Sequence, residues 1–382
     1  MVLGLKQPKP ITSDNSMRFL VVLEMYTCFI ERGVSLLRWG GKLSYIVPSA
    51  WIGGPAYARL RSFLLRYQVE ALVLLPFNTF PSAYVDTAIA VVSKQISKST
   101  HSVRTYVFRK RDKLSQIELD DAQYRQIKQQ DWQVSKDHKF VLDPETVSLL
   151  HRLQVACPRS LGDVVFMKRG VLFDKSLLTD TRESYQGYLY FEGNVYRYEI
   201  NIVASRWMEF GDTMKERPKE FHWFEGERIL LWWLVNRRQR LMAALTTETF
   251  ITNKNLYTVL VHHNSIDIRI LLGVLNSRLL SFLYIRQVTQ AVKDDFPQVT
   301  IKDILSLPFP SATAIANHAT RMVELVERML LLHKQLVTAK TSHDKTALQR
   351  QIDATDQQID QFVYELYGLT EEEIKIIEEG IQ

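Results

Sequence analysis

The chain has 382 residues, of which 46% are hydrophobic and 24% are charged, so it has room for two or three domains with hydrophobic cores. Its two cysteines form no Cys-x-x-Cys pair, which excludes a thiol-rich zinc site and argues against a disulfide framework; we predict no metal site. No apolar run approaches the ~20 residues that cross a bilayer, and the N-terminus lacks a signal-peptide layout. We therefore expect a cytoplasmic protein with no membrane partner.

The net charge of +6 is unevenly distributed along the chain. Residues 1–315 contain 41 basic and 30 acidic side chains, a balance of +11, whereas residues 316–382 contain 7 and 12, a balance of −5. A basic body with an acidic tail predicts a polyanionic partner for the body, although a soluble protein with uneven charge is the alternative.

The first hundred residues are predicted to form alternating helices and strands. The expected elements are a helix, a strand, a second helix and two further strands: Arg18–Arg38, Lys42–Val47, Tyr57–Tyr67, Val69–Leu75 and Thr87–Ser93. Strands that are almost continuously apolar and joined by helices predict a mostly parallel sheet covered on both faces. A short loop joins the last two strands, so this pair should be antiparallel. Three strands make only one edge of a doubly wound sheet.

The remainder of the chain divides into three parts by composition. Residues 101–157 are polar and are predicted to be a linker with one β piece. Residues 158–315, with short β-like runs and many aromatic side chains, predict an irregular α+β domain with helices at Arg228–Leu245 and Ile268–Arg286. Residues 316–382 carry a heptad-like apolar seam on two helices, which predicts an antiparallel helical hairpin.

Several sequence motifs occur in an order and spacing that resemble a known family. They are Gly40-Gly41-Lys42-Leu43-Ser44-Tyr45-Ile46-Val47-Pro48, Phe80-Pro81-Ser82-Ala83-Tyr84-Val85-Asp86-Thr87, Gly193-Asn194-Val195-Tyr196-Arg197-Tyr198 and Leu305-Ser306-Leu307-Pro308-Phe309-Pro310. Together they resemble the C-terminal portion of a type IIG restriction-modification, adenine-specific (N6) DNA methyltransferase, including its target recognition domain.

The resemblance implies a fold and a domain order. Residues 1–100 would be a partial Rossmann-like half of a class I methyltransferase domain, 101–157 a linker, 158–315 an α+β target recognition domain and 316–382 the helical hairpin. Double-stranded DNA would be the partner, and S-adenosylmethionine the cofactor of the complete enzyme. The chain contains neither the catalytic Asn-Pro-Pro-Tyr motif nor the Gly-rich turn that holds this cofactor. We therefore assign no catalytic residue and expect the isolated chain to be inactive without an upstream methyltransferase fragment.

The resemblance also suggests a base pocket in the first hundred residues. It places Phe80 on one wall of the pocket for a flipped-out adenine, and an aromatic ring in a loop after a strand can stack on a base. Pro48 and Trp51 follow a strand end, where open α/β sheets place ligands. For all three residues a role in core packing is the alternative.

Candidate DNA-contacting residues flank three turns of the recognition region: Lys168 and Arg169; Asn194, Arg197 and Tyr198; Lys254 and Asn255. Arg and Lys can read guanine edges, Asn can read adenine, and cationic side chains also bind phosphate without sequence preference. A solvated surface charge is the alternative for each. At the level of the whole chain, the alternatives are a stand-alone sequence-specific DNA-binding subunit without methylation, and a degenerate remnant.

Overall fold

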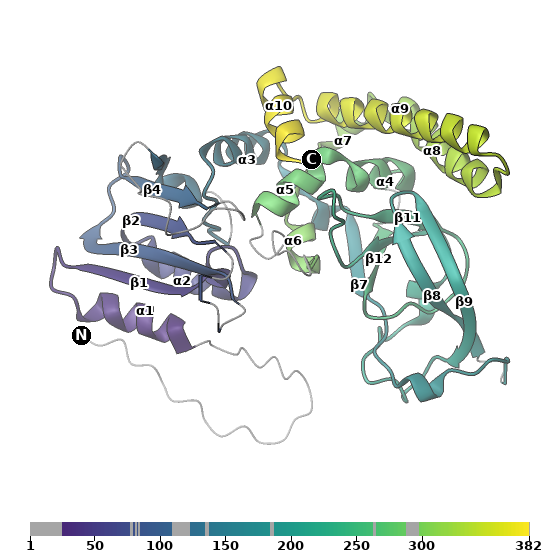
Figure 1. Ribbon diagram of the computed structural model, residues 1–382, viewed down its shortest axis with the longest axis horizontal. Helices are drawn as coiled ribbons and strands as arrows, with labels where there is room; N and C mark the ends of the chain where they lie inside the picture. Colours follow the sequence, from purple (N-terminus) through teal and green to yellow (C-terminus); the bar gives the residue numbers. More distant parts are fainter. Residues whose placement is uncertain are drawn as a thin grey trace.

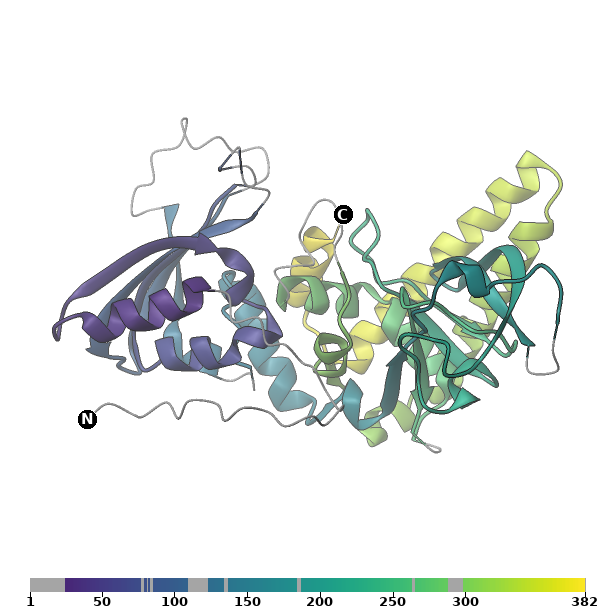
Figure 2. The ribbon, with the colours of Figure 1, turned by 90° about the horizontal axis from the view of Figure 1, so that it is seen from below.

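Two lobes lie side by side in the computed structural model, with α3 (Pro144–Ala156) between them (Figures 1 and 2). The structure describes residues 25–76, 79–80, 82, 85–108, 123–133, 137–183, 187–262, 265–287 and 298–381. The first lobe comprises the elements before α3, and the second comprises the strands and helices after it.

A five-stranded sheet in the order β1-β3-β2-β4-β5 forms the first lobe. Its elements are α1 (Met25–Leu36), β1 (Lys42–Pro48), α2 (Ala58–Leu64), β2 (Tyr67–Leu74), β3 (Thr87–Ile96), β4 (Ser102–Val107) and β5 (Arg125–Lys128). The antiparallel pairing predicted for β2 and β3 is confirmed, but the prediction of a mostly parallel sheet is wrong, because only β2 and β4 pair in parallel. β1 and β2 run in the same direction, as their helical connection requires, but β3 lies between them and pairs antiparallel with both.

Helices α1 and α2 cover one face of this sheet. Ile30 and Val34 of α1 and Leu64 of α2 are buried against apolar strand residues such as Leu72 and Val92. The predicted helix Arg18–Arg38 is described only as Met25–Leu36, and its earlier residues lie outside the described ranges. β4 and β5 fall within residues 101–157, so this segment is not a linker alone: part of it completes the first sheet.

The second lobe contains a four-stranded antiparallel sheet in the order β11-β10-β12-β7 and a long antiparallel hairpin of β8 and β9. The strands are β7 (Val165–Arg169), β8 (Gly187–Tyr196), β9 (Glu199–Glu209), β10 (Arg228–Trp232), β11 (Ala243–Thr246) and β12 (Leu256–Val261), and a small pair is formed by β6 (Arg159–Ser160) and β13 (Pro308–Phe309).

The helix predicted at Arg228–Leu245 is absent; this range forms β10, a turn and β11. Ile229 and Leu231 pack into one apolar cluster, whereas Leu230 packs into another on the opposite face of the sheet. A strand with two buried faces has a continuous apolar run, which cannot be told from a buried helix by its pattern alone. Gln239, with a backbone φ of 56°, lies in the turn that breaks the range.

The helix predicted at Ile268–Arg286 is two helices, α4 (Ile268–Asn276) and α5 (Arg278–Gln287), bent by 58°. The buried Asn276 is the last residue of α4, at the break. Its side-chain amide accepts a hydrogen bond from the Ala243 N–H at 3.0 Å and donates one to the Ala243 carbonyl at 2.9 Å. Within the described ranges, no single helix is long and apolar enough to span a membrane. The bent pair α4 and α5 would reach that length and hydrophobicity only if both helices are counted together, and almost all of its residues are buried in the protein.

Helices α6 (Ile301–Leu305), α7 (Ala312–Ala316), α8 (Ala319–Thr338), α9 (Ser342–Leu366) and α10 (Glu371–Gly380) complete the chain. α8 and α9 are joined by three residues and lie along each other over the second lobe (Figure 1). Met322 and Met329 of α8 and Ile352 and Ile359 of α9 are buried, which agrees with the apolar seam in the sequence. Arg152 of α3 binds Glu373 of α10 at 2.7 Å and so ties the end of the chain to the connecting helix.

Ionic contacts fix the first lobe to the second. The Lys139 Nζ and the Asp303 Oδ1 are 2.7 Å apart, and both side chains are at most 5% exposed. Close by, Lys302 pairs with Asp137 at 3.0 Å. The fully buried Arg61 donates to the Asp137 carbonyl at 2.7 Å, and burial lowers the pKa of Arg61 to about 10. The two lobes are therefore held as one unit through this region.

The two cysteines should differ sharply in reactivity, because Cys28 is exposed and Cys157 is buried. Burial raises the pKa of Cys157 to about 11, so at pH 8 roughly a thousandth of this thiol is the reactive thiolate. We expect iodoacetamide to label Cys28 alone in the folded protein and both cysteines in denaturant, as read by mass spectrometry of peptides. Equal labelling of Cys157 in the folded protein would contradict this packing.

Candidate nucleic-acid interface

A groove of about 480 Å³ opens at the carboxyl end of β7. One wall is Lys168-Arg169-Gly170, and the other is the segment Glu216–Glu220 with His222 and Trp223. β7 is the edge strand of its sheet and lies on the side of the second lobe nearest the first lobe (Figure 1).

Gly170 lets the chain leave β7 in close contact with a neighbouring turn. Its N–H donates to the Leu256 carbonyl at 3.0 Å, and the next N–H, of Val171, donates to the Thr252 carbonyl at 2.8 Å. A Cβ atom at Gly170 would lie 2.2 Å from the Asn253 carbonyl oxygen. Only glycine permits this approach of two backbones.

Replacing Gly170 with alanine should push the turn at Asn253 away from β7, because a backbone carbonyl cannot yield as a flexible side chain does. We expect a loss of about 2 kcal/mol in the free energy of unfolding, by analogy with other strained or overpacked sites, measured by urea denaturation. Gly211→Ala, at a glycine with no neighbour within 4 Å and no left-handed backbone, is the matched control for adding a methyl group. A Gly170→Ala protein as stable as wild type would show that the two backbones are not in this contact.

The turn beside Gly170 brings together four of the seven predicted DNA-contacting residues. The Asn253 side chain accepts the Asn255 N–H at 2.8 Å and so shapes the turn, which leaves Lys254 exposed. The Arg169 Nε donates to the Lys254 carbonyl at 2.8 Å. This bond uses one of the five guanidinium N–H groups and orients the rest of the group. Lys168 is exposed next to it.

The opposite wall supplies cations that sequence reasoning missed. Arg217 is held by Asp212 at 2.5 Å, and its guanidinium carbon lies 5.1 Å from the centre of the Phe210 ring. Lys219 is exposed two residues later, and His222 pairs with Glu220 at 2.9 Å. The run Lys215-Glu216-Arg217-Pro218-Lys219 is a visible signal in the sequence, because it concentrates charge around a proline in a turn-rich segment.

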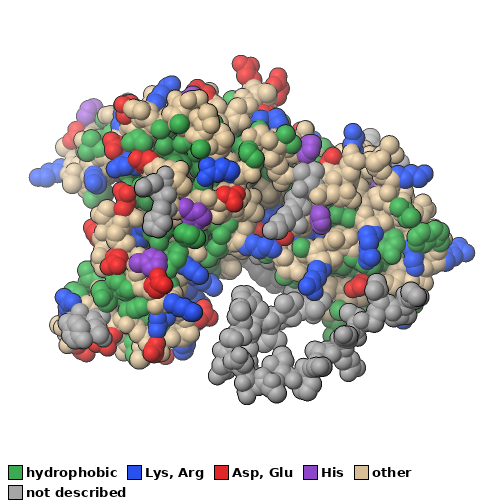
Figure 3. Space-filling view, turned by 180° about the vertical axis from the view of Figure 1, so that it is seen from behind, with side chains coloured by type: hydrophobic (Ala, Val, Ile, Leu, Met, Phe, Trp, Pro, Cys, Tyr) green, Lys and Arg blue, Asp and Glu red, His purple; other side chains and the backbone are tan. Residues whose placement is uncertain are grey.

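Positive charge dominates the groove. Lys168, Arg169, Arg217 and Lys219 line it against only two carboxylates, Glu216 and Glu220. The space-filling view shows a hollow between the two lobes with Lys and Arg side chains on both of its sides (Figure 3). This arrangement suits a polyanion that lies across both lobes.

Arg197 and Tyr198 do not join this groove, which corrects their prediction as DNA-contacting residues. Arg197 binds the Asp356 carboxylate of α9 through both terminal nitrogens, one of them at 2.8 Å, and its Nε donates to the Asn276 carbonyl at 3.2 Å. Burial by itself lowers the pKa of Arg197, but Asp356 outweighs it and raises the pKa above its ordinary value. Tyr198 is only 4% exposed, and burial raises its pKa.

The remaining candidate of this set, Asn194, is half-buried in β8, at the end of the hairpin that reaches α9. The adjacent Arg240 is also buried in this ionic cluster, with its guanidinium 3.8 Å from Asp356 and 3.5 Å from Asp360. Arg237–Arg240 falls within the range predicted as a helix, Arg228–Leu245; it is a turn that ends in this buried charge. The β8–β9 turn is therefore an anchor on α9.

The three predicted base-pocket residues differ in their positions: Pro48 ends a strand, Phe80 is exposed and Trp51 is buried in the core. Pro48, at the carboxyl end of β1, pairs with Thr87, and the Ser49 N–H donates to the Asp86 carbonyl at 2.9 Å, so this strand end lies beside the start of β3. Phe80 is 40% exposed. Trp51 is instead fully buried, with its ring 5.7 Å from that of Phe140. Trp51 is a core residue, which corrects its prediction as a pocket residue. The carboxyl end of β1 points toward the second lobe (Figure 1).

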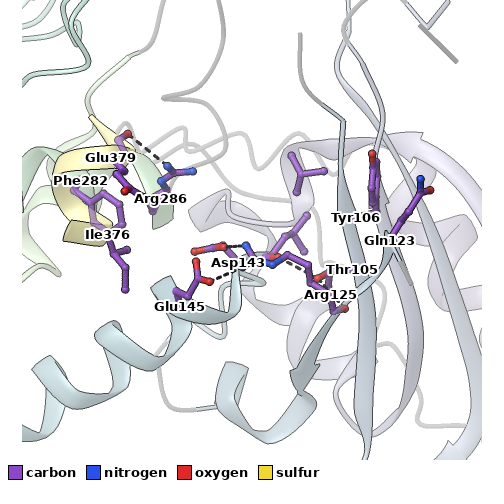
Figure 4. A pocket seen from close by; sticks show the side chains of 13 residues that line it. Thr105, Tyr106, Gln123, Arg125, Asp143, Glu145, Phe282, Arg286, Ile376 and Glu379 are labelled. Carbon is purple, nitrogen blue, oxygen red and sulfur yellow. Dashed lines mark hydrogen bonds and ion pairs between the residues drawn. The ribbon is translucent and has the colours of Figure 1, made fainter. Parts of the chain in front are cut away.

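A larger cavity, of about 690 Å³, lies between the first sheet, α3, α5 and α10 (Figure 4). Its charged side chains face one another: Arg125 binds Asp143 and, at 2.6 Å, Glu145, while Arg286 donates to the Gly380 carbonyl at 3.4 Å. Because two arginines face three carboxylates there, Asp143, Glu145 and Glu379, the cavity is a poorer polyanion site than the groove at β7.

Comparisons with known proteins agree with this division into two lobes. Residues 12–80 match the family described as the Eco57I restriction-modification methylase, and residues 188–309 match the family described as the TaqI-like C-terminal specificity domain. The chain is 31% identical over 312 residues to the Methanocaldococcus jannaschii protein RM.MjaORFECS2P, whose name describes a type II restriction enzyme and methyltransferase. The alignment covers 79% of this chain but only 26% of that relative.

Among solved structures, the type IIL restriction-modification enzyme MmeI in complex with DNA is similar over 93% of this chain and 50% of that one, with a TM-score of 0.52 and 11% identity. The type IIG restriction endonuclease BpuSI is similar over 94% of this chain and 50% of that one, with a TM-score of 0.37 and 14% identity. The MmeI likeness supports a shared mixed α/β fold. By sequence, the chain is therefore similar to a methyltransferase of a restriction-modification system, over about a quarter of that relative's length, and residues 188–309 are similar to the TaqI-like C-terminal specificity domain.

Proposed function

We propose that the chain recognises double-stranded DNA and contributes one wall of the base pocket of an adenine-N6 methyltransferase. The observation that carries this proposal is the groove at the end of β7. Lys168 and Arg169 of β7 line it, Lys254 and Asn255 lie in the adjoining turn before β12, and Arg217 and Lys219 line the opposite wall. A guanidinium held by one backbone carbonyl presents its remaining donors in a fixed plane, which suits a guanine edge, whereas the lysines suit phosphate.

The first lobe supports the second half of this proposal. We infer that it is the downstream half of a class I methyltransferase domain and that Phe80 stacks on the flipped-out adenine. Pro48 lies at the carboxyl end of β1, which points toward the specificity lobe (Figure 1), and the Phe80 ring is exposed enough to offer a face to a base. DNA in the hollow between the lobes would meet both surfaces.

The isolated chain should not transfer a methyl group. S-adenosylmethionine supplies the methyl group in the complete enzyme, but the described residues do not fit a site for it. In the one described strand–glycine turn–helix segment, β1 to α2, a Cβ atom at Gly54 would lie 2.6 Å from the Ala50 carbonyl oxygen and 2.9 Å from the Tyr57 ring. The protein itself fills this turn, so we derive no step through the cofactor here.

A binding selection tests the proposal. The purified chain would be mixed with random 30-base-pair duplexes, and the bound fraction sequenced at two salt concentrations. We expect one enriched sequence motif, and an affinity for it that falls with salt more slowly in relative terms than the affinity for random duplex. Binding that is indifferent to sequence and vanishes as salt rises would refute target recognition. Methylation by the chain alone with labelled S-adenosylmethionine would refute the expected inactivity.

A further inference from the structure

An exposed aromatic pair extends the groove along β7. Phe166 is 54% exposed, and its ring centre lies 3.9 Å from that of His262, with the two planes at 44°. Val165 and Met167, on either side of Phe166 in the strand, are buried in the core. Because side chains alternate between the two faces of a strand, Phe166 lies on the same outward face as Lys168. An exposed ring and a cation that lines the groove are therefore neighbours on one face of one strand.

Backbone hydrogen bonds hold the two members of this pair together. Phe166 is paired with Leu260 of β12, and the N–H of His262, directly after β12, donates to the Val164 carbonyl at 2.8 Å. The Ser265 hydroxyl donates to the same carbonyl at 3.3 Å, and the Ser265 N–H donates to the His262 carbonyl at 3.0 Å. The imidazole therefore supports one side of the Phe166 ring, and the rest of the ring is left to the solvent.

Packing of the folded chain does not account for this arrangement. More than half of the Phe166 side chain stays in water, so its burial contributes little to stability. Within the described ranges, the His262 Nε2 is covered from solvent and has no hydrogen-bond partner, an arrangement that normally costs free energy. A pair that gains little for the fold and costs a hydrogen bond is better explained by a ligand that covers it.

The charge of the adjoining groove indicates which ligand this is. Lys168 and Arg169 continue from Phe166 along β7, and Arg217 and Lys219 line the opposite wall. Phe166 and Lys168 are two residues apart, which is about 6.8 Å along a strand or two base-pair steps of duplex DNA. A duplex drawn to the cations therefore also lies over Phe166. The major groove of DNA offers an apolar group at its base edges, the 5-methyl group of thymine.

The position of Phe166 favours contact with a base edge over insertion between base pairs. An inserted side chain must pass the base edges. Phe166 rests against His262, and the longer side chain of Lys168 stands beside it on the same face of β7. The ring is therefore held at the level of its neighbours, where it meets the outer edge of a base.

We propose that Phe166, supported by His262, contacts the 5-methyl group of a thymine in the major groove and so makes the chain select thymine at one position of its target. This rests on the proposed function, because it takes the groove at β7 to be a DNA site. Phe166 and Arg169 are three residues apart, about 10 Å along the strand. The selected thymine therefore lies within about three base pairs of the base that Arg169 contacts.

The test compares thymine with uracil, which differ only by this methyl group. Each thymine of the sequence enriched in the binding selection is replaced singly by deoxyuridine, and affinities are measured by fluorescence anisotropy. One replacement, within about three base pairs of the position at which Arg169→Ala relaxes the preference, should weaken wild-type binding about fourfold, as expected for one buried methyl group. Phe166→Ala should bind the thymine and uracil duplexes equally, whereas Phe166→Leu, which keeps an apolar contact, should retain a preference of about twofold. Phe166→Ala should not change the salt dependence, because it removes no charge.

Phe29→Ala is the matched control, because Phe29 is 53% exposed on α1, outside the groove. It should leave the ratio of thymine to uracil affinity at its wild-type value. The series of replacements with the wild-type chain depends on no variant, so it is informative even if Phe166→Ala does not fold.

Three results would overturn the proposal. The first is an enriched sequence in which every thymine tolerates uracil, and the second is a thymine preference that Phe166→Ala leaves intact. The third is a rise in the fluorescence of 2-aminopurine next to the thymine that Phe166→Ala abolishes, which would assign Phe166 to insertion between base pairs. Failure of the proposed function is distinguishable from these results, because the selection would then enrich no sequence at all.

Discussion

The double variant Lys168→Ala/Arg169→Ala is expected to bind its DNA target about 30-fold more weakly than the wild-type chain, a loss of roughly 2 kcal/mol. Both side chains are exposed in the groove at the end of β7, and Arg169 is already oriented by the Lys254 carbonyl at 2.8 Å. Loss of two cationic contacts should also reduce the slope of log affinity against log salt by about 2. Fluorescence anisotropy at several salt concentrations measures both quantities.

The two single variants should behave differently, because the two cations are held differently. The Arg169 guanidinium is held in a fixed plane. Arg169→Ala should therefore weaken binding to the preferred sequence more than binding to random duplex, and so reduce the ratio of the two affinities. The Lys168 ammonium is a point charge with no fixed plane, so Lys168→Ala should weaken binding to the preferred sequence and to random duplex by the same factor. Equal effects of the two variants on the preference would show that Arg169 contacts phosphate only.

Lys345→Ala/Arg350→Ala is the matched control, since it removes the same charge from exposed positions of α9. It should change affinity by less than about threefold, because it acts only through long-range charge, which salt screens. If this control weakened binding as strongly as the groove variant, net charge rather than the groove would carry the interaction.

The largest expected effect on stability is that of Arg197→Ala. Arg197 binds Asp356 through both terminal nitrogens, and the two side chains are 20% and 16% exposed. Removing the arginine leaves a largely buried carboxylate without its main partner, which typically costs about 3–5 kcal/mol. Urea denaturation should show this loss. The matched control is Arg206→Ala, whose partner Glu192 is more exposed and whose loss should cost less than about 1 kcal/mol.

This stability difference should depend on pH in a definite direction. Burial tends to raise the pKa of Asp356, but Arg197 outweighs it and lowers the pKa below its ordinary value. A carboxyl group with a lowered folded-state pKa stabilises the protein above its unfolded pKa of ~3.9, and this stabilisation is lost as pH falls through the folded-state value. The gap between wild type and Arg197→Ala should therefore be full at pH 7 and shrink below about pH 4. A gap independent of pH would mean that Arg197 acts by packing alone.

Local periodicity was enough to predict the order of elements in the first lobe and the helices at the end of the chain. α1 and β1–β3 repeat apolar residues at the spacing of their own type, so each could be predicted from its neighbours in sequence. The sheet order could not. β3 lies between β1 and β2 because of contacts between residues far apart in the chain, and β4 and β5 join the sheet although their segment is polar.

The candidate site shows the same division. Lys168, Arg169, Lys254 and Asn255 were predicted because turns after β-like runs expose polar side chains, and the structure brings them together through the pairing of β7 with β12. Arg197 stands in an identical local context, but its partner, Asp356, is 159 residues away. No local pattern distinguishes an arginine that faces solvent from one that meets a carboxylate on a distant helix.

The buried Lys139–Asp303 pair has a consequence for how DNA would be handled. Because this buried contact joins the two lobes, it favours one separation between the β7 groove and the carboxyl end of β1. On the proposed function, a sequence read at the groove would be modified at a fixed offset, counted in steps of about 3.4 Å per base pair. The separation of these two surfaces would then determine which adenine of the target is methylated.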